Sequence, residues 1–189
     1  MKTIKKFTFA MLTLVAFSFT FTSCDAISDA LSKEVDMDAP TIDFSIGGEA
    51  AVNAPQQKVS GATEVIWLEK SVDLKTRIQE ELDKSSLKTD NVKKLELIAS
   101  IIKVSSTINK NYDLGNIKLY VNDELIANGI GSIASTATQF VLTYNSPYSV
   151  LSFLNTGTYK IKITSDKPKP TEKLDMQLLN TYKGKFSLL

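Results

Sequence analysis

Histidine is absent from the 189 residues of this chain. Its absence excludes Ser-His-Asp and Cys-His nucleophilic sites, the zinc-protease helix motif and every His-ligated metal centre. It also removes the side chain whose charge ordinarily changes near neutral pH. The chemistry that remains is carboxylate acid/base catalysis, lysine chemistry or oxygen-ligated calcium. We therefore expect a protein that is not an enzyme.

Cysteine occurs once, at Cys24, so no disulfide can form within the chain and its folded part must be stabilised by packing. The chain also lacks a strong excess of positive or negative charge, because it has 22 Lys and Arg residues and 21 Asp and Glu residues. A chain without a basic surplus offers no electrostatic case for binding nucleic acid or an anionic membrane surface. We expect no nucleic-acid partner and no cofactor.

The N-terminus has the pattern of a secretory signal peptide. Lys2, Lys5 and Lys6 precede an uncharged, Phe-rich stretch at residues 7–21, and small polar residues follow it. A basic start, an apolar region of ~7–15 residues and small residues at the end are typical of such a leader. A membrane-spanning helix needs ~20 apolar residues, so this run is too short to be one.

The leader ends in Phe21-Thr22-Ser23-Cys24, which resembles the lipobox of bacterial lipoproteins, with Phe21 in place of the usual Leu. The relaxed box and the Lys/Thr/Phe-rich leader are similar to those of Bacteroidota outer-membrane lipoproteins. The resemblance implies that Cys24 is lipidated on sulfur and becomes the new N-terminus. It also implies an anchored protein of the cell envelope, at the outer membrane and facing the periplasm or the cell surface. The alternative is an ordinary secretory peptide with an incidental cysteine.

The predicted organisation is a signal peptide at 1–23, the lipidated cysteine with a flexible tether at 24–40, and a single domain at 41–189. Without the leader the chain has 19 basic and 21 acidic residues, a formal charge of −2. Asp36, Asp38 and Asp43 suggest calcium, but the glycine and glutamate of an EF-hand loop are missing. We therefore predict no metal site.

Short segments of period-two alternation predict strands over most of the domain. The predicted strands are 41–46, 63–72, 92–104, 138–144, 158–164 and 174–188, the last as one bent strand or a pair, with a hairpin at 116–127. Helices are predicted at 74–84, capped by Asp73, and from Ser146 to Gly157. Residues 129–132 are expected to begin a mobile loop and residues 166–173 to form an exposed connection. The fold class is mainly β, most simply a two-layer antiparallel β-sandwich of immunoglobulin-like architecture with two short inserted helices.

The segment 92–104 is apolar at almost every position, which predicts a strand covered on both faces. Leu95, Leu97, Ala99 and Ile101 are expected on one face, and the 74–84 helix is expected to lie over one side. The competing interpretation is a buried helix over 92–108, but the Ile and Val content favours the strand. Within the 74–84 helix, Glu80 and Lys84 have the favourable i, i+4 order of an ion pair.

The chain resembles small β-sandwich lipoproteins of Bacteroidota, a resemblance that carries no functional residues with it. We expect a membrane-anchored, non-enzymatic binding or structural module of the envelope that meets a protein partner through a sheet face or loops. The alternative is an envelope carbohydrate- or lipid-binding protein, with Trp67 and Tyr120 as candidate ligand-binding residues. Trp67 lies between Ile66 and Leu68, which favours a core or sheet-packing position over ligand stacking.

Overall fold

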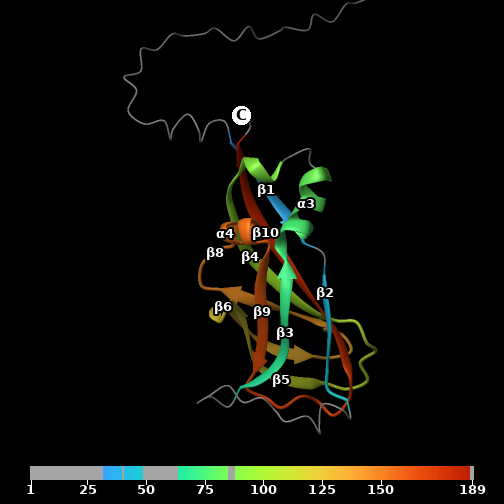
Figure 1. Cartoon of the computed structure of the whole chain (residues 1–189). Helices are drawn as coiled ribbons and strands as arrows, with labels where there is room; N and C mark the ends of the chain where they lie inside the picture. The colour runs from blue at the N-terminus through green and yellow to red at the C-terminus, as the bar shows by residue number, and fades with distance from the viewer. Residues whose placement is uncertain (1–31, 40, 49–63, 85–87, 188–189) are drawn as a thin grey trace, which may run out of the picture. The chain divides into compact units, whose positions relative to one another are not determined.

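The computed structural model describes residues 32–39, 41–48, 64–84 and 88–187 (Figure 1). All of them belong to the second of two units, Leu31–Leu189. The predicted leader, Cys24 and the first part of the predicted tether lie outside the described residues. The strands are β1 Ser32–Asp38, β2 Ile42–Ile46, β3 Val65–Asp73, β4 Val92–Val104, β5 Tyr112–Val121, β6 Glu124–Ile133, β7 Gln139–Tyr144, β8 Tyr148–Ser149, β9 Thr158–Ser165 and β10 Leu174–Ser187. The helical segments are α3 Leu74–Lys84, the 3-10 turn η1 Thr89–Asn91 and α4 Leu151–Thr156.

The strands form one antiparallel sheet in the order β1-β10-β4-β7-β6-β5-β9-β3, with β2 paired to β10 and β8 to β4. The sheet curls into a half-barrel and does not separate clearly into two layers (Figure 1). The curl brings β9 to face β10, although four strands lie between them in the sheet order. Across the interior, the hydroxyl oxygens of Tyr159 and Tyr182 are 2.5 Å apart. The predictions of a mainly β fold, an antiparallel sheet and two short helices are confirmed.

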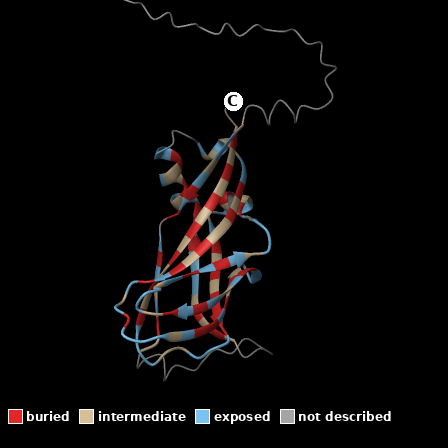
Figure 2. Cartoon of the chain, turned by 180° about the vertical axis from the view of Figure 1, so that it is seen from behind, coloured by how far each residue is buried: buried red, intermediate tan, exposed pale blue. Residues whose placement is uncertain are grey.

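The last strand, β10, is the longest and supplies much of the core. Every second residue from Leu174 to Phe186 is buried, and the residues between them are half-buried (Figure 2). Strict alternation of this kind belongs to a strand with one face on the core. Of the two predicted alternatives for 174–188, the single long strand is correct.

The predicted tether is wrong over residues 32–38. These residues form β1, which pairs with β10 from Ser32 opposite Ser187 to Asp38 opposite Thr181. Met37 is buried against the core, and Val35 packs on it. Acidic residues at the other positions hid the strand from sequence reasoning, because they face solvent on an edge strand.

The strand interpretation of 92–104 is correct and the helical alternative is wrong, but the predicted faces hold only in part. β10 pairs Thr181 with Ala99 and Tyr182 with Leu97, which leaves Ile98 as the extra residue of a β-bulge. A bulge shifts the alternation by one residue, so the side chains exchange faces at this point. The buried positions of β4 are therefore Leu95, Leu97, Ser100, Ile102 and Val104.

The predicted hairpin is confirmed and is longer than expected. Asn122 and Asp123 have φ of 47° and 67°, the left-handed pair of a type I′ turn. The prediction of a mobile loop at 129–132 is wrong, because β6 continues to Ile133. Glycine is needed there for close approach: a Cβ at Gly131 would lie 2.8 Å from the Cβ of Leu114.

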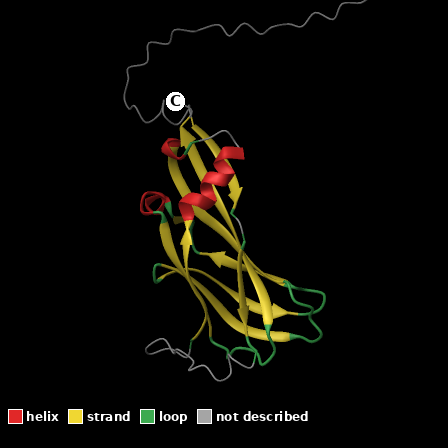
Figure 3. Cartoon of the chain, turned by 45° about the vertical axis from the view of Figure 1, so that its right-hand side comes forward, coloured by secondary structure: helices red, strands yellow, loops and turns green. Residues whose placement is uncertain are grey.

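Both helices lie at the same end of the sheet (Figure 3). The predicted cap of α3 is confirmed, since the Asp73 carboxylate accepts the Thr76 backbone N–H at 3.0 Å. The predicted buried face is also confirmed, because Leu74, Ile78 and Leu82 are fully buried. The predicted partner of Lys84 is wrong: its ammonium pairs with Glu81, three residues away, and not with Glu80.

The 74–84 helix is predicted to lie over the strand at 92–104, but it is not the main helix on that strand. α3 packs mainly on α4, β1 and β9, whereas α4 is the helix that packs on β4. The predicted start of the second helix at Ser146 is wrong, because Tyr148 and Ser149 pair with β4 as β8 and α4 begins after Val150. Its predicted end at Gly157 is confirmed, with φ of 84° and an N–H donated to the Phe153 carbonyl.

Candidate functional site

Trp67, one of the two candidate ligand-binding residues, lies in the core. It occupies a bulge of β3 between Ile66 and Leu68, and only 5% of the residue is exposed. Stacking on a sugar requires an open ring face, and the indole of Trp67 offers none. Its Nε1–H has no hydrogen-bond partner among the described residues.

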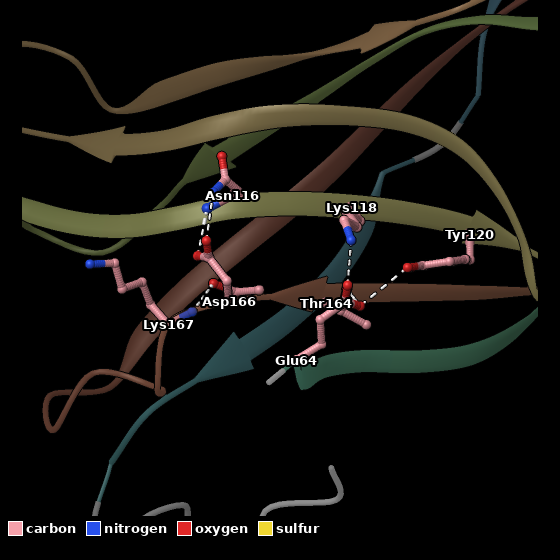
Figure 4. Close-up of polar contacts among 8 residues, drawn as sticks. Glu64, Asn116, Lys118, Tyr120, Thr164, Asp166 and Lys167 are labelled. Atoms are coloured by element: carbon pink, nitrogen blue, oxygen red, sulfur yellow. Dashed lines mark hydrogen bonds and ion pairs between the residues drawn. The ribbon is translucent and has the colours of Figure 1, made fainter. Parts of the chain in front are cut away.

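Tyr120, the other candidate, lies on the outer face of β5 and is half-buried. The Lys162 ammonium lies 4.8 Å from the centre of its ring and also pairs with Asp123 at 2.5 Å. The Tyr120 hydroxyl donates to the Glu64 carboxylate at 3.2 Å (Figure 4). Lysine covers one ring face and the hydroxyl is engaged, so Tyr120 is not an open platform for stacking.

Glu64 is the centre of this polar cluster (Figure 4). Its carboxylate pairs with the Lys118 ammonium and accepts the Thr164 hydroxyl at 2.9 Å. The hydrogen bond from Lys118 lowers the pKa of Glu64, against the opposing effect of burial. Burial, and then the charge of Glu64, raise the pKa of Tyr120. These groups satisfy one another's hydrogen-bonding capacity, so the cluster fixes Glu64 to β5 and β9.

The neighbouring polar contacts in Figure 4 fix the turn after β9. Asp166 accepts the backbone N–H of Asn116 at 2.8 Å and its side-chain amide at 2.5 Å. The Lys167 backbone N–H donates to the Ser165 hydroxyl at 2.9 Å. These bonds attach the start of the exposed connection at residues 166–173 to β5, so their role is structural.

Metal binding finds no support in the part of the chain that the structure describes. Within it, no group of three or more Asp, Glu, His or Cys side chains is arranged to hold a metal ion. Within the same residues, no helix has the length and apolarity needed to cross a membrane.

An apolar row crosses the outer face of the sheet. Leu179 of β10 lies opposite Ile101 of β4, and Ile101 lies opposite Val141 of β7. β6 pairs with β7 at Ala127 opposite Tyr144 and Asn128 opposite Thr143. Ile130 of β6 lies near Val141, because a Cβ at its neighbour Gly129 would lie 2.7 Å from the Val141 carbonyl oxygen. We call these four side chains, Leu179, Ile101, Val141 and Ile130, the apolar row.

The row is open to solvent at one end. Ile130 is 73% exposed and Val141 is 58% exposed, whereas Ile101 and Leu179 are half-buried. Val141 points outward because Phe140 and Leu142, on either side of it, are buried. Covering the exposed parts of Ile130 and Val141 would stabilise a complex by about 3 kcal/mol at the usual gain for buried apolar area.

The surroundings of the row are mostly polar, and their charges lie on and beside β4 and β10. The outward residues next to it along the four strands are Gln177, Thr181, Ala99, Lys103, Gln139, Thr143, Asn128 and Ser132. Beside β10, the carboxylates of Asp43 and Asp38 accept hydrogen bonds from Gln177 at 2.9 Å and Thr181 at 2.8 Å. Around Val141 and Ile130 the neighbours on β7 and β6 are uncharged. This neutrality is visible in the sequence, because residues 125–159 contain no Asp, Glu, Lys or Arg. Sequence reasoning missed the row because it assigned Ile130 to a loop. The charge-free segment and the apolar triplet at 140–142 are the signals that could have revealed it.

No model of a known protein family matches this chain, and no curated protein matches it.

Proposed function

We propose that this protein is a membrane-anchored, non-enzymatic binding module of the cell envelope, and that the apolar row binds a partner protein. The observation that carries the proposal is the run of four apolar side chains across four adjacent strands, on the face that points away from the core. Neighbouring strands are ~4.8 Å apart, so the row extends ~14 Å. That length is comparable to the central, desolvated part of a small protein interface.

The lack of charge on β6 and β7, around the exposed end of the row, supports a protein partner. Charged residues are depleted at the centres of interfaces, because removing them from water is costly without a matched partner. The strands β6 and β7 lie in the charge-free segment 125–159. A surface of this composition favours an apolar contact with polar surroundings over a charged ligand.

The anchor is part of the same proposal. The lipobox-like sequence that ends in Cys24 supports lipidation at that residue, followed by retention at the outer membrane. Several acyl chains at ~0.8 kcal/mol per buried methylene would hold the protein on a bilayer essentially permanently. Labelling cells with a clickable fatty acid should tag the protein, and Cys24→Ala should abolish the label. A label that persists in Cys24→Ala would contradict lipidation at this residue.

We further propose that the two halves of the curled sheet face each other as the two layers of the predicted sandwich. One layer would contain β1, β2, β10 and β4, and the other β3, β9, β5 and β6. The interior contact between Tyr159 and Tyr182 supports this arrangement, because it joins a strand of each layer.

Co-purification from solubilised membranes tests the binding proposal. The amount of partner protein recovered with the Ile130→Ser/Val141→Ser double variant should be at least tenfold lower, as expected from the apolar area removed. Leu125→Ser is the matched control, because Leu125 is 42% exposed and lies outside the row. All three substitutions affect exposed side chains, so thermal unfolding should change little and will verify folding. Equal recovery of the partner with both variants, or a stoichiometric glycan or lipid in place of a protein, would contradict the proposal.

A further inference from the structure

A second surface feature lies at the helical end of the sheet, away from the apolar row. It is a cleft of about 380 Å³ between α3, α4 and residues 89–92, where η1 continues directly into β4. Pockets for small molecules occupy ~300–1,000 Å³, so this cleft suits a ligand smaller than most drugs. The residues that line it are Lys75, Thr89, Asp90, Val92, Leu151 and Leu154.

The lining separates into an apolar part and a polar part. Leu154 is 8% exposed, and Val92 and Leu151 are half-buried and pack on the core. Lys75 and Asp90 contribute exposed charges of opposite sign. Thr89, a half-buried residue that precedes Asp90 in the chain, adds a hydroxyl group to the lining. The cleft thus combines one cation, one anion and an apolar wall.

The two charged side chains of this cleft are exposed and can pair with a ligand. Within the described ranges, the Lys75 ammonium and the Asp90 carboxylate form no ion pair or side-chain hydrogen bond. A second cleft, on β1, β10 and β4, shows the contrasting case. There, Lys183 pairs with Glu34 at 2.8 Å, and Lys94 pairs with Glu96 at 2.8 Å.

We propose that the cleft between α3 and α4 binds a small zwitterion with an apolar side chain, of the kind presented by a short apolar peptide or a free apolar amino acid. The ligand carboxylate pairs with Lys75, and the ligand ammonium pairs with Asp90. The apolar side chain lies on Val92, Leu151 and Leu154. A neutral ligand would form neither ion pair and should therefore bind more weakly than the zwitterion.

Both charged side chains are exposed, so each ion pair is screened and contributes modestly. Loss of one of them should weaken binding by about fivefold at low ionic strength. The dependence on salt follows from the same exposure, and affinity should fall as ionic strength rises. Affinity should also fall when the ligand side chain is polar, because the apolar wall then remains wet.

Amide NMR titration of the full chain in detergent micelles tests the proposal, with leucyl-leucine as the probe. Shifts should concentrate at residues 75, 89–92 and 151–154. Lys75→Gln and Asp90→Asn should each weaken binding about fivefold, whereas Lys70→Gln, an exposed lysine on β3, should not. The spectrum of each variant shows whether it remains folded.

Two further probes identify the ligand chemistry. Free leucine and leucyl-leucine share the required groups, so binding of either one supports the proposal. The one that binds more tightly shows whether the ligand is a free amino acid or a short peptide. Seryl-serine should bind more weakly than leucyl-leucine. The proposal is overturned if N-acetyl-leucyl-leucine amide, which has no charged end, binds as well as leucyl-leucine. It is also overturned if leucyl-leucine and free leucine both leave the cleft residues unshifted at millimolar concentration.

Discussion

The hydroxyl pair in the interior makes a quantitative prediction about the curl of the sheet. Tyr159 and Tyr182 are 2% and 1% exposed, and their hydroxyl oxygens lie 2.5 Å apart. Burial is the main cause that raises the pKa of Tyr159 to about 12. Tyr182→Phe would leave the Tyr159 hydroxyl buried without this partner, at a cost of about 1–3 kcal/mol in the free energy of unfolding. Tyr159→Phe should cost about 1 kcal/mol, because the Tyr182 hydroxyl keeps a hydrogen bond with Asn180.

The double variant distinguishes a real contact from two unrelated losses. When both hydroxyls are removed, no hydroxyl of this pair remains buried without its partner. The loss in the free energy of unfolding should therefore be smaller than the sum of the two single losses by about 1 kcal/mol. Urea unfolding with an unchanged m-value measures each free energy. In thermal unfolding, 1 kcal/mol corresponds to about 2–4 °C for a domain of this size. Additivity within about 0.3 kcal/mol would refute the contact, and with it the facing of β9 and β10.

Three further predictions concern single side chains. The hydrogen bond from Lys118 lowers the pKa of Glu64 below its ordinary value of 4.5. Its contribution to stability is therefore complete above that pH and is lost as the pH falls through the lowered pKa, so Glu64→Gln should flatten the acid limb of a stability–pH profile. Asp73→Ala removes the cap of α3 and should cost about 0.5–2 kcal/mol by urea unfolding, whereas Asp73→Asn should cost much less. Gly131→Ala forces a Cβ to 2.8 Å from Leu114 and should cost about 1–3 kcal/mol by the same measurement, a loss that an open loop at 129–132 would not show.

The sequence predicted the elements whose alternation is regular. β2 and β9 follow the period of two with apolar residues inward, as expected for strands with one buried face. β4 departed from prediction because one extra residue at Ile98 reverses every later side chain. No local property of Ile98 marks it as a bulge, and its effect depends on the pairing with β10. Register of this kind is set by long-range contacts that a single sequence does not display.

The candidate site was less accessible to sequence reasoning than the fold. Trp67 and Tyr120 were chosen for their aromatic character, but the structure buries the first and pairs the second with Glu64 and Lys162. The apolar row combines side chains from four strands that are distant in sequence, so its continuity depends on strand order. Only its neutrality was visible beforehand, as the charge-free segment 125–159.

Photo-cross-linking in intact cells tests the central claim most directly, with benzoylphenylalanine placed at residue 141 and, as the control, at residue 125. Both positions are exposed and apolar, but only Val141 belongs to the row. Binding through the row predicts one discrete cross-linked protein from position 141 and little from position 125. A discrete product from position 125 alone, equal products from both or none from position 141 would contradict it.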